Sequence, residues 1–182
     1  MLFGDSSVAS DWKTACAKFL SLLGEIQANR QQQGKVVKQL PIINERTRQA
    51  RVKRDEANQA HAASLLVLDP QNLSGASETR AALDNAEMHL IECRDQQKLI
   101  ADGYVALNNK IIETVKEADK CLATIRELAK AEFKAKWSRD AAWKSGSEAE
   151  FDWRASVLDG LLVKVASGDA SAVEGLDVFF SG

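Results

Sequence analysis

The sequence contains few of the residues that interrupt helices. Only two prolines and ten glycines occur among its 182 residues, which leaves little material for strands and tight turns. Its three cysteines are an odd number, so we expect free thiols in a reducing compartment. No run of about 18 apolar residues is present, and residues 1–5 lack the basic start of a leader, so we expect neither export nor membrane insertion. The composition predicts an all-α protein.

Apolar residues recur with heptad spacing between residues 77 and 144, which predicts one long helix. No proline interrupts this stretch, and Gly103 alone costs only about 1 kcal/mol relative to alanine. A helix with so narrow an apolar stripe needs a second helix to cover it. The predicted coiled-coil seam comprises Leu83, Leu90, Ile100, Tyr104, Leu107, Ile111, Ile125 and Leu128.

A second heptad pattern runs through residues 6–68 and predicts the covering helix, with a kink or brief break near Pro41. Between the two helices, residues 69–76 carry Pro, Asn, Ser and Gly and predict a turn, after which Ser74 or Ser77 caps the second helix. The chain therefore folds into a long antiparallel hairpin. Placing the apex in this turn sets Leu40 opposite Tyr104.

The aromatic residues concentrate near the two ends of the chain and predict a small helical head on a single elongated unit. Residues 147–180 contribute to this head. Ser147 and Glu150 form a capping box for a helix that Gly168 ends. The apolar tail with Phe179 and Phe180 either packs into the head, which we favour, or inserts into a partner.

Positive charge is concentrated between residues 30 and 54, where eight Lys and Arg residues face the single acid Glu45. One interpretation is a solvated face that Glu92, Asp95 and Asp102 of the other limb partly neutralise. The alternative is a docking surface for an acidic protein or, less favoured without interleaved aromatics, for a polynucleotide. The candidate partner-binding residues are Arg46, Arg48, Arg51, Lys53, Arg54, Phe179 and Phe180.

The predicted hairpin has a weak seam and no recognisable catalytic motif. Thr47, Arg54 and His61 occupy seam positions, so we expect the chain to stabilise itself as a homodimer at least. His89 and Cys93 have zinc-ligand spacing but lack further donors, so packing is the favoured interpretation. We expect neither a metal nor a cofactor, and no enzymatic activity.

Three segments carry a resemblance to a known family: Leu73-Ser74-Gly75, then Ile91-Glu92-Cys93-Arg94 with Gln97, Ala101, Gly103 and Tyr104, and finally Leu161-Leu162 with Ala166, Gly168 and Asp169. Through them the chain resembles the polarity suppression (Psu) family of satellite bacteriophages, in disconnected pieces spread over about half of its length. The longer N-terminal limb and the different apolar tail depart from the family pattern.

The resemblance implies a non-enzymatic dimeric helical clamp of a phage or phage satellite. Such a protein decorates the capsid, inhibits the host transcription terminator Rho, or does both, in the host cytoplasm or on the virion surface. Two alternatives remain open, namely a generic coiled-coil adaptor, scaffold or chaperone, and a nucleic-acid-binding helical protein.

Overall fold

The computed structural model describes residues 7–67 and 73–181. Its helices are α1 (Ser7–Leu66), α2 (Leu73–Arg139), α3 (Ala141–Lys144), α4 (Glu148–Ala166) and α5 (Ser171–Ser181). No strand occurs within these two described ranges, and the prediction of an all-α protein built on a long helical hairpin is confirmed. The chain divides into two compact units: the hairpin unit, residues 29–110, and the core unit, residues 1–28 with 111–182.

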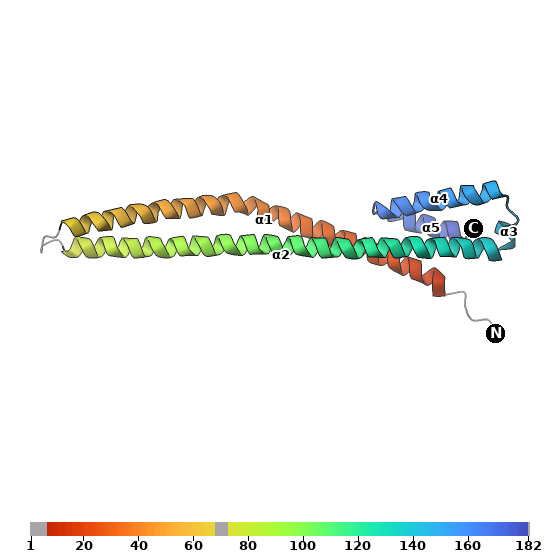
Figure 1. Ribbon diagram of the computed structural model, residues 1–182, viewed down its shortest axis with the longest axis horizontal. Coiled ribbons are helices and arrows are strands. Elements are labelled where there is room, and N and C mark those ends of the chain that lie inside the picture. Colours follow the sequence, from red (N-terminus) through yellow and green to blue (C-terminus); the bar gives the residue numbers. More distant parts are fainter. Residues whose placement is uncertain (1–6, 68–72, 182) are drawn as a thin grey trace. The chain divides into compact units, whose positions relative to one another are not determined.

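In the hairpin unit, α1 and α2 lie side by side and run in opposite directions (Figure 1). Side-chain hydrogen bonds join them: Gln33 Nε2 donates to Asn108 Oδ1 at 3.3 Å, and Gln97 Nε2 donates to Asn44 Oδ1 at 2.7 Å. Pro41 lies inside α1, and the helix continues through it without a break. A proline removes one backbone donor, and the remaining hydrogen bonds on either side keep this long helix intact.

The predicted boundary of the turn is wrong on its C-terminal side. Residues 68–72 lie outside the described part of the chain, but α2 already begins at Leu73, so residues 73–76 are helical. Ser74 and Ser77 therefore lie after the first residue of the helix, so neither stands at its N-cap position. The physical reason is that residues 73–76 include no proline to block the helix, and Gly75 costs only about 1 kcal/mol relative to alanine. The hydrogen bond between Asn44 and Gln97 also sets a register roughly one helical turn away from the one that places Leu40 opposite Tyr104.

The core unit contains one continuous hydrophobic core. Its buried residues come from α1, α2, α3, α4 and α5: Trp12, Cys16, Phe19, Leu22, Ile26, Ala118, Ile125, Ala129, Phe133, Trp143, Leu158, Leu162, Val165, Ala172 and Leu176. Phe133 lies among four other rings, with its centroid 5.1 Å from Phe151, 5.9 Å from Trp143, 6.2 Å from Phe179 and 6.4 Å from Trp137. Three of these pairs are tilted or edge-on, which suits the ring quadrupoles, and the Phe133–Phe179 pair is stacked; all four bury large apolar areas.

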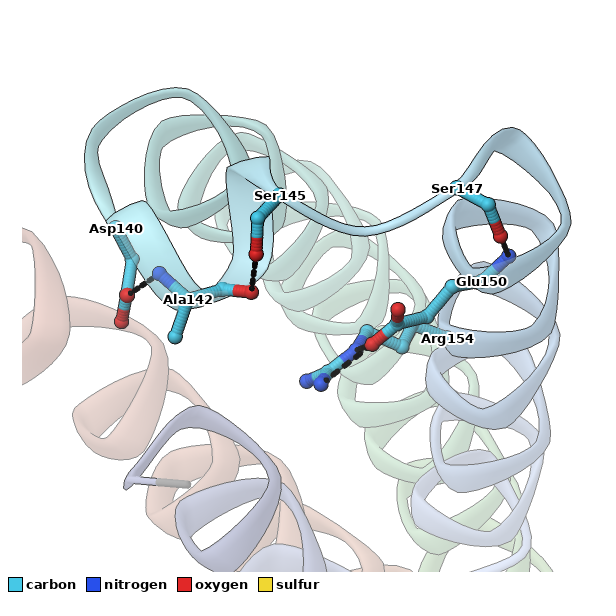
Figure 2. A network of polar contacts seen from close by, with 6 residues as sticks. All are labelled: Asp140, Ala142, Ser145, Ser147, Glu150 and Arg154. Carbon is cyan, nitrogen blue, oxygen red and sulfur yellow. Dashed lines mark hydrogen bonds and ion pairs between the residues drawn. The ribbon is translucent and has the colours of Figure 1, made fainter.

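The prediction that one helix extends to residue 144 is wrong, because α2 ends at Arg139. Asp140 has an extended backbone, and its Oδ1 accepts a hydrogen bond from Ala142 N at 2.9 Å, so it caps the short helix α3 (Figure 2). This break redirects the chain so that Trp143 becomes buried, with only 1% of its surface exposed. Asp140 can cap a new helix with its side chain, but the residues on both sides of it are good helix formers that favour one continuous helix. Packing of the Trp143 indole ring favours the break.

The caps of α4 confirm the sequence-based prediction in part: the serine half of the capping box and the glycine stop are formed, but the glutamate half is not. Ser147 Oγ accepts from Glu150 N at 3.3 Å, while the Glu150 carboxylate bonds to Arg154 at 3.0 and 3.1 Å and not to the cap (Figure 2). Gly168, with φ of +85°, follows the helix, and Asp169 N donates to Lys164 O at 3.1 Å. A left-handed residue after the last turn satisfies carbonyls that would otherwise lack a partner.

Candidate protein-binding surfaces

All predicted seam residues of α2 are at least partly buried. Leu83, Leu90, Ile111 and Ile125 are buried, whereas Ile100, Tyr104, Leu107 and Leu128 are half-buried. Tyr104 and Leu107 belong to the hairpin unit.

The interior of the hairpin unit is thin and partly polar. Its buried hydrophobic cluster consists of Ala50, Leu90 and Cys93. The neighbouring Thr47 is buried, and its Oγ1 donates to Ile43 O at 2.9 Å and approaches Cys93 O at 3.5 Å. Hydrogen bonds between side chains fix the register but contribute only about 0.5–1.5 kcal/mol each, far less than a filled apolar core. Two helices joined in this way have much of their surface available for another protein.

The end of the hairpin unit nearest the turn also has a polar interior. His61 Nδ1 lies 3.1 Å from Thr79 Oγ1, and Ser64 Oγ lies 2.8 Å from the same atom. His89 Nε2 is 3.8 Å from Cys93 Sγ, but no group of three His, Cys, Asp or Glu side chains able to hold a metal occurs within the described residues. These histidines are part of polar packing between or along helices.

The predicted basic residues of α1 divide into paired and unpaired ones. Arg48 binds Glu45 through two hydrogen bonds of 2.8 Å, and this arginine together with Gln49 lowers the pKa of the Glu45 carboxyl group to about 2. Arg54 is half-buried, and its Nη2 lies 2.8 Å from Asp55 Oδ1 while its Nε is buried without a hydrogen-bond partner. Both ion pairs are formed within α1.

Arg46, Arg51 and Lys53 are exposed, and in the described part of the hairpin unit no ion pair joins them to an acid. These three cations form a solvated face, as one interpretation expected, but without ion pairs to acids of α2 in the described residues. The reason is geometric, because Glu92, Asp95 and Asp102 are exposed residues that do not reach across the seam. Arg46 and Lys53 lie on one side of the seam, since seven residues are two helical turns, and Arg51 lies on the other side.

A groove of about 270 Å³ lies between α1 and α2 on the Arg46 side of the seam. Ile43 and Ile100 contribute apolar surface to it, and its other lining residues are Gln39, Ile42, Arg46 and Gln96. Ile42 is 57% exposed, and Leu99, three residues after Gln96 on the same side of α2, is 74% exposed. Sequence reasoning missed these two residues. The available signal was a large apolar side chain at a position outside the heptad seam.

Phe179 and Phe180 lie in the core unit and not on a free surface. Both are half-buried and pack against the core, with the Phe180 ring centroid 5.7 Å from Trp12 and that of Phe179 5.6 Å from Trp143. Lys136 Nζ donates a hydrogen bond to the Phe180 carbonyl oxygen, and Lys13 Nζ lies 2.5 Å from Asp177 Oδ1. The prediction that the tail packs inside is confirmed.

The core unit has a wider groove of about 870 Å³ between α1 and α2. Ala15, Cys121 and Leu128 contribute its apolar surface, and charged side chains surround them. Among these, Lys18 Nζ lies 2.7 Å from Glu117 Oε1, so each partner shifts the other's pKa toward its charged form. This groove is open and amphiphilic.

Comparison with known proteins gives no relative for this arrangement. No protein-family model, no curated protein and no solved structure matches the chain significantly. Within residues 7–67 and 73–181, no helix combines the length and the apolar composition needed to cross a membrane.

Proposed function

We propose that the protein is a non-enzymatic binding protein that acts as a homodimer and docks on an acidic surface of another protein through the basic side chains of α1. The observation that carries the proposal is the set of exposed cations on α1, with Arg46, Arg51 and Lys53 lacking an ion-pair partner in the described residues. Unpaired cations held on a helix favour rapid encounter with a negatively charged partner.

The thin interior of the hairpin unit supports the dimeric part of this proposal. A hairpin of two helices with polar seam positions such as Thr47 and His61 gains stability when a further helix covers its apolar surface. The nature of the grooves supports a binding role over catalysis, because both are open surfaces bordered by exposed charged side chains.

The resemblance to the polarity suppression family supplies the candidate partners, which are a phage capsid protein and the host terminator Rho. Under this proposal the dimer clamps one or both of them, in the host cytoplasm or on the virion surface. A generic adaptor, scaffold or chaperone would share the basic surface but bind a different protein. A nucleic-acid-binding protein would use the same cations for phosphates.

The test uses Arg30→Glu/Arg51→Glu, a double variant that reverses two exposed cations on the side of α1 away from the groove. Purified wild-type protein and variant are assayed for co-sedimentation with phage capsids and for read-through at a Rho-dependent terminator. We expect activity in at least one assay and its loss in the variant. The control Lys134→Glu/Lys144→Glu makes the same change in charge on exposed residues of the core unit and should retain activity.

Each outcome separates the alternatives. No effect of wild-type protein in either assay would refute the phage role. Activity that survives in Arg30→Glu/Arg51→Glu would refute the basic surface as the docking site. Binding to double-stranded DNA that weakens steeply with added salt would favour the nucleic-acid alternative, since phosphate contacts release counterions.

A further inference from the structure

The side of α2 that is turned away from α1 in the hairpin unit carries a regular stripe of its own. Leu90 and Cys93 are buried with Ala50 of α1, and Asp95 is turned from these two residues by roughly 140° and 200° around the helix, so it lies on the opposite side. Residues on that side follow one another in steps of four, three, four, four and three. This outer stripe comprises Asp84, Met88, Ile91, Asp95, Leu99 and Asp102.

Three large apolar side chains of the outer stripe are open to solvent. Met88 is 61% exposed, Ile91 is 56% exposed and Leu99 is 74% exposed. Single exposed apolar residues are common on protein surfaces and need no explanation. Here three of them share one side of a single helix at the spacing of a helix-packing stripe, and α1 does not cover them because it packs on the opposite side of α2.

Carboxylates alternate with these apolar side chains and determine the charge that an occupant must carry. Asp95 separates Ile91 from Leu99, and Asp102 follows Leu99 by three residues. Both aspartates are exposed, and within the described residues no ion pair joins either of them to a cation. A helix that covers the apolar side chains also removes water from these carboxylates. Because an unpaired carboxylate is costly to desolvate, the occupant needs cations at the matching positions.

The same stripe on a second copy of the chain does not supply these cations. The outer stripe contains no Lys or Arg, and the nearby Arg94 and Lys98 lie toward one edge of it. A twofold contact of stripe on stripe would bring Asp95 and Asp102 of the two copies together, where like charges repel. Charge complementarity therefore favours a different molecule as the occupant.

We propose that the outer stripe binds an amphipathic helix of another protein, one that carries Lys or Arg between its apolar residues. The stripe is about 27 Å long, which matches a partner helix of about five turns. Its charge preference is opposite to that of the basic residues of α1. The proposal therefore adds a second partner to the proposed function and does not depend on it.

Fluorescence anisotropy of a labelled peptide mixed with the full-length chain tests this surface. The probe is an amphipathic peptide of about three heptads with leucine and lysine on one face, and a second peptide carries glutamate in place of lysine. We expect the wild-type chain to bind the lysine peptide at least about tenfold more tightly than the glutamate peptide. The variants Asp95→Lys/Asp102→Lys and Met88→Gln/Leu99→Gln should each weaken binding of the lysine peptide at least about tenfold.

Two matched controls change residues outside the outer stripe. Asp119→Lys/Glu127→Lys makes the same change in charge on exposed residues of the core unit, and Val37→Gln/Val52→Gln makes a similar apolar-to-polar change on α1, where each valine is 45% exposed. Both should bind the lysine peptide within about threefold of the wild-type affinity. Helix content measured by circular dichroism should stay constant, since all four variants alter exposed side chains.

The possible outcomes separate this surface from the other proposals. Absence of binding by the wild-type chain, equal binding of the two peptides, or stripe variants that bind as tightly as the controls would refute the outer stripe as a binding surface. Sedimentation equilibrium identifies the occupant, because Met88→Gln/Leu99→Gln should leave self-association unchanged. Weaker self-association of this variant would show that a second copy occupies the stripe and would refute the basic partner helix. The basic surface of α1 has its own assays, so it stands or fails separately.

Discussion

Replacing Trp143 with alanine would test how much burial of this indole stabilises the core unit. The indole is 1% exposed, and its ring centroid lies 5.9 Å from Phe133, 6.3 Å from Trp137 and 5.6 Å from Phe179. Truncating a buried large aromatic side chain costs about 3–5 kcal/mol, through lost burial and the cavity that remains. Since domains are commonly stable by only about 5–15 kcal/mol, Trp143→Ala should remove much of the stability of the core unit.

Trp153 provides the matched control within the same unit. This side chain is 63% exposed on α4, so Trp153→Ala should change the free energy of unfolding by no more than about 0.5 kcal/mol. Urea unfolding followed by far-ultraviolet circular dichroism measures both variants. Hydrogen exchange with mass spectrometry then assigns any loss to peptides of the core unit, because the two units can open separately. Equal losses in Trp143→Ala and Trp153→Ala would refute the reasoning.

A conservative variant sharpens the same prediction. Trp143 Nε1 is buried without a hydrogen-bond partner in the described structure, and such an unsatisfied donor costs about 1–3 kcal/mol. Trp143→Phe removes this donor while keeping an aromatic ring among its neighbours and beneath the Arg154 guanidinium, which lies 4.2 Å from the ring centroid. We therefore expect Trp143→Phe to lose less than half as much stability as Trp143→Ala, and a loss as large as that of alanine would contradict the unsatisfied donor.

Three further predictions follow from other parts of the molecule. Gly168→Ala should destabilise the protein by about 1–2 kcal/mol in thermal unfolding, because φ at this position is +85°, where a Cβ atom is strained; no loss would argue against the left-handed cap. Burial raises the pKa of the Cys16 thiol to about 11, so little of it is the reactive thiolate. Iodoacetamide should therefore label the half-buried Cys121 before Cys16, as followed by peptide mass spectrometry. Faster labelling of Cys16 would contradict this. In an NMR titration the Glu45 carboxyl group should have a pKa of about 2, and in Arg48→Ala its pKa should lie nearer the ordinary value. Because the pKa is lowered in the folded protein, the stabilisation from this ion pair is present at neutral pH and is lost as the pH falls toward 2. A titration midpoint that is the same in Arg48→Ala would exclude the ion pair as the cause.

Local features of the sequence predicted most of the secondary structure. Heptad spacing identified the two long helices, and every predicted seam residue of α2 from Leu83 to Leu128 is buried or half-buried. Ser147 caps α4 and Gly168 follows its last turn, as the residue types require. These features depend only on residues within a few positions of one another, so they can be read without knowing the partner helix.

The tertiary structure alone decided which helix positions are opposite, where the second helix ends and which charges pair. Contacts across the hairpin, such as Gln97 to Asn44, define the register, and the break at Asp140 accompanies burial of Trp143. Arg48 forms an ion pair with Glu45 on its own helix, whereas no ion pair in the described residues joins Arg46 to an acid of α2. The physical reason is that periodicity and capping are properties of short segments, whereas register, breaks and ion pairs depend on side chains that folding brings together from distant parts of the chain.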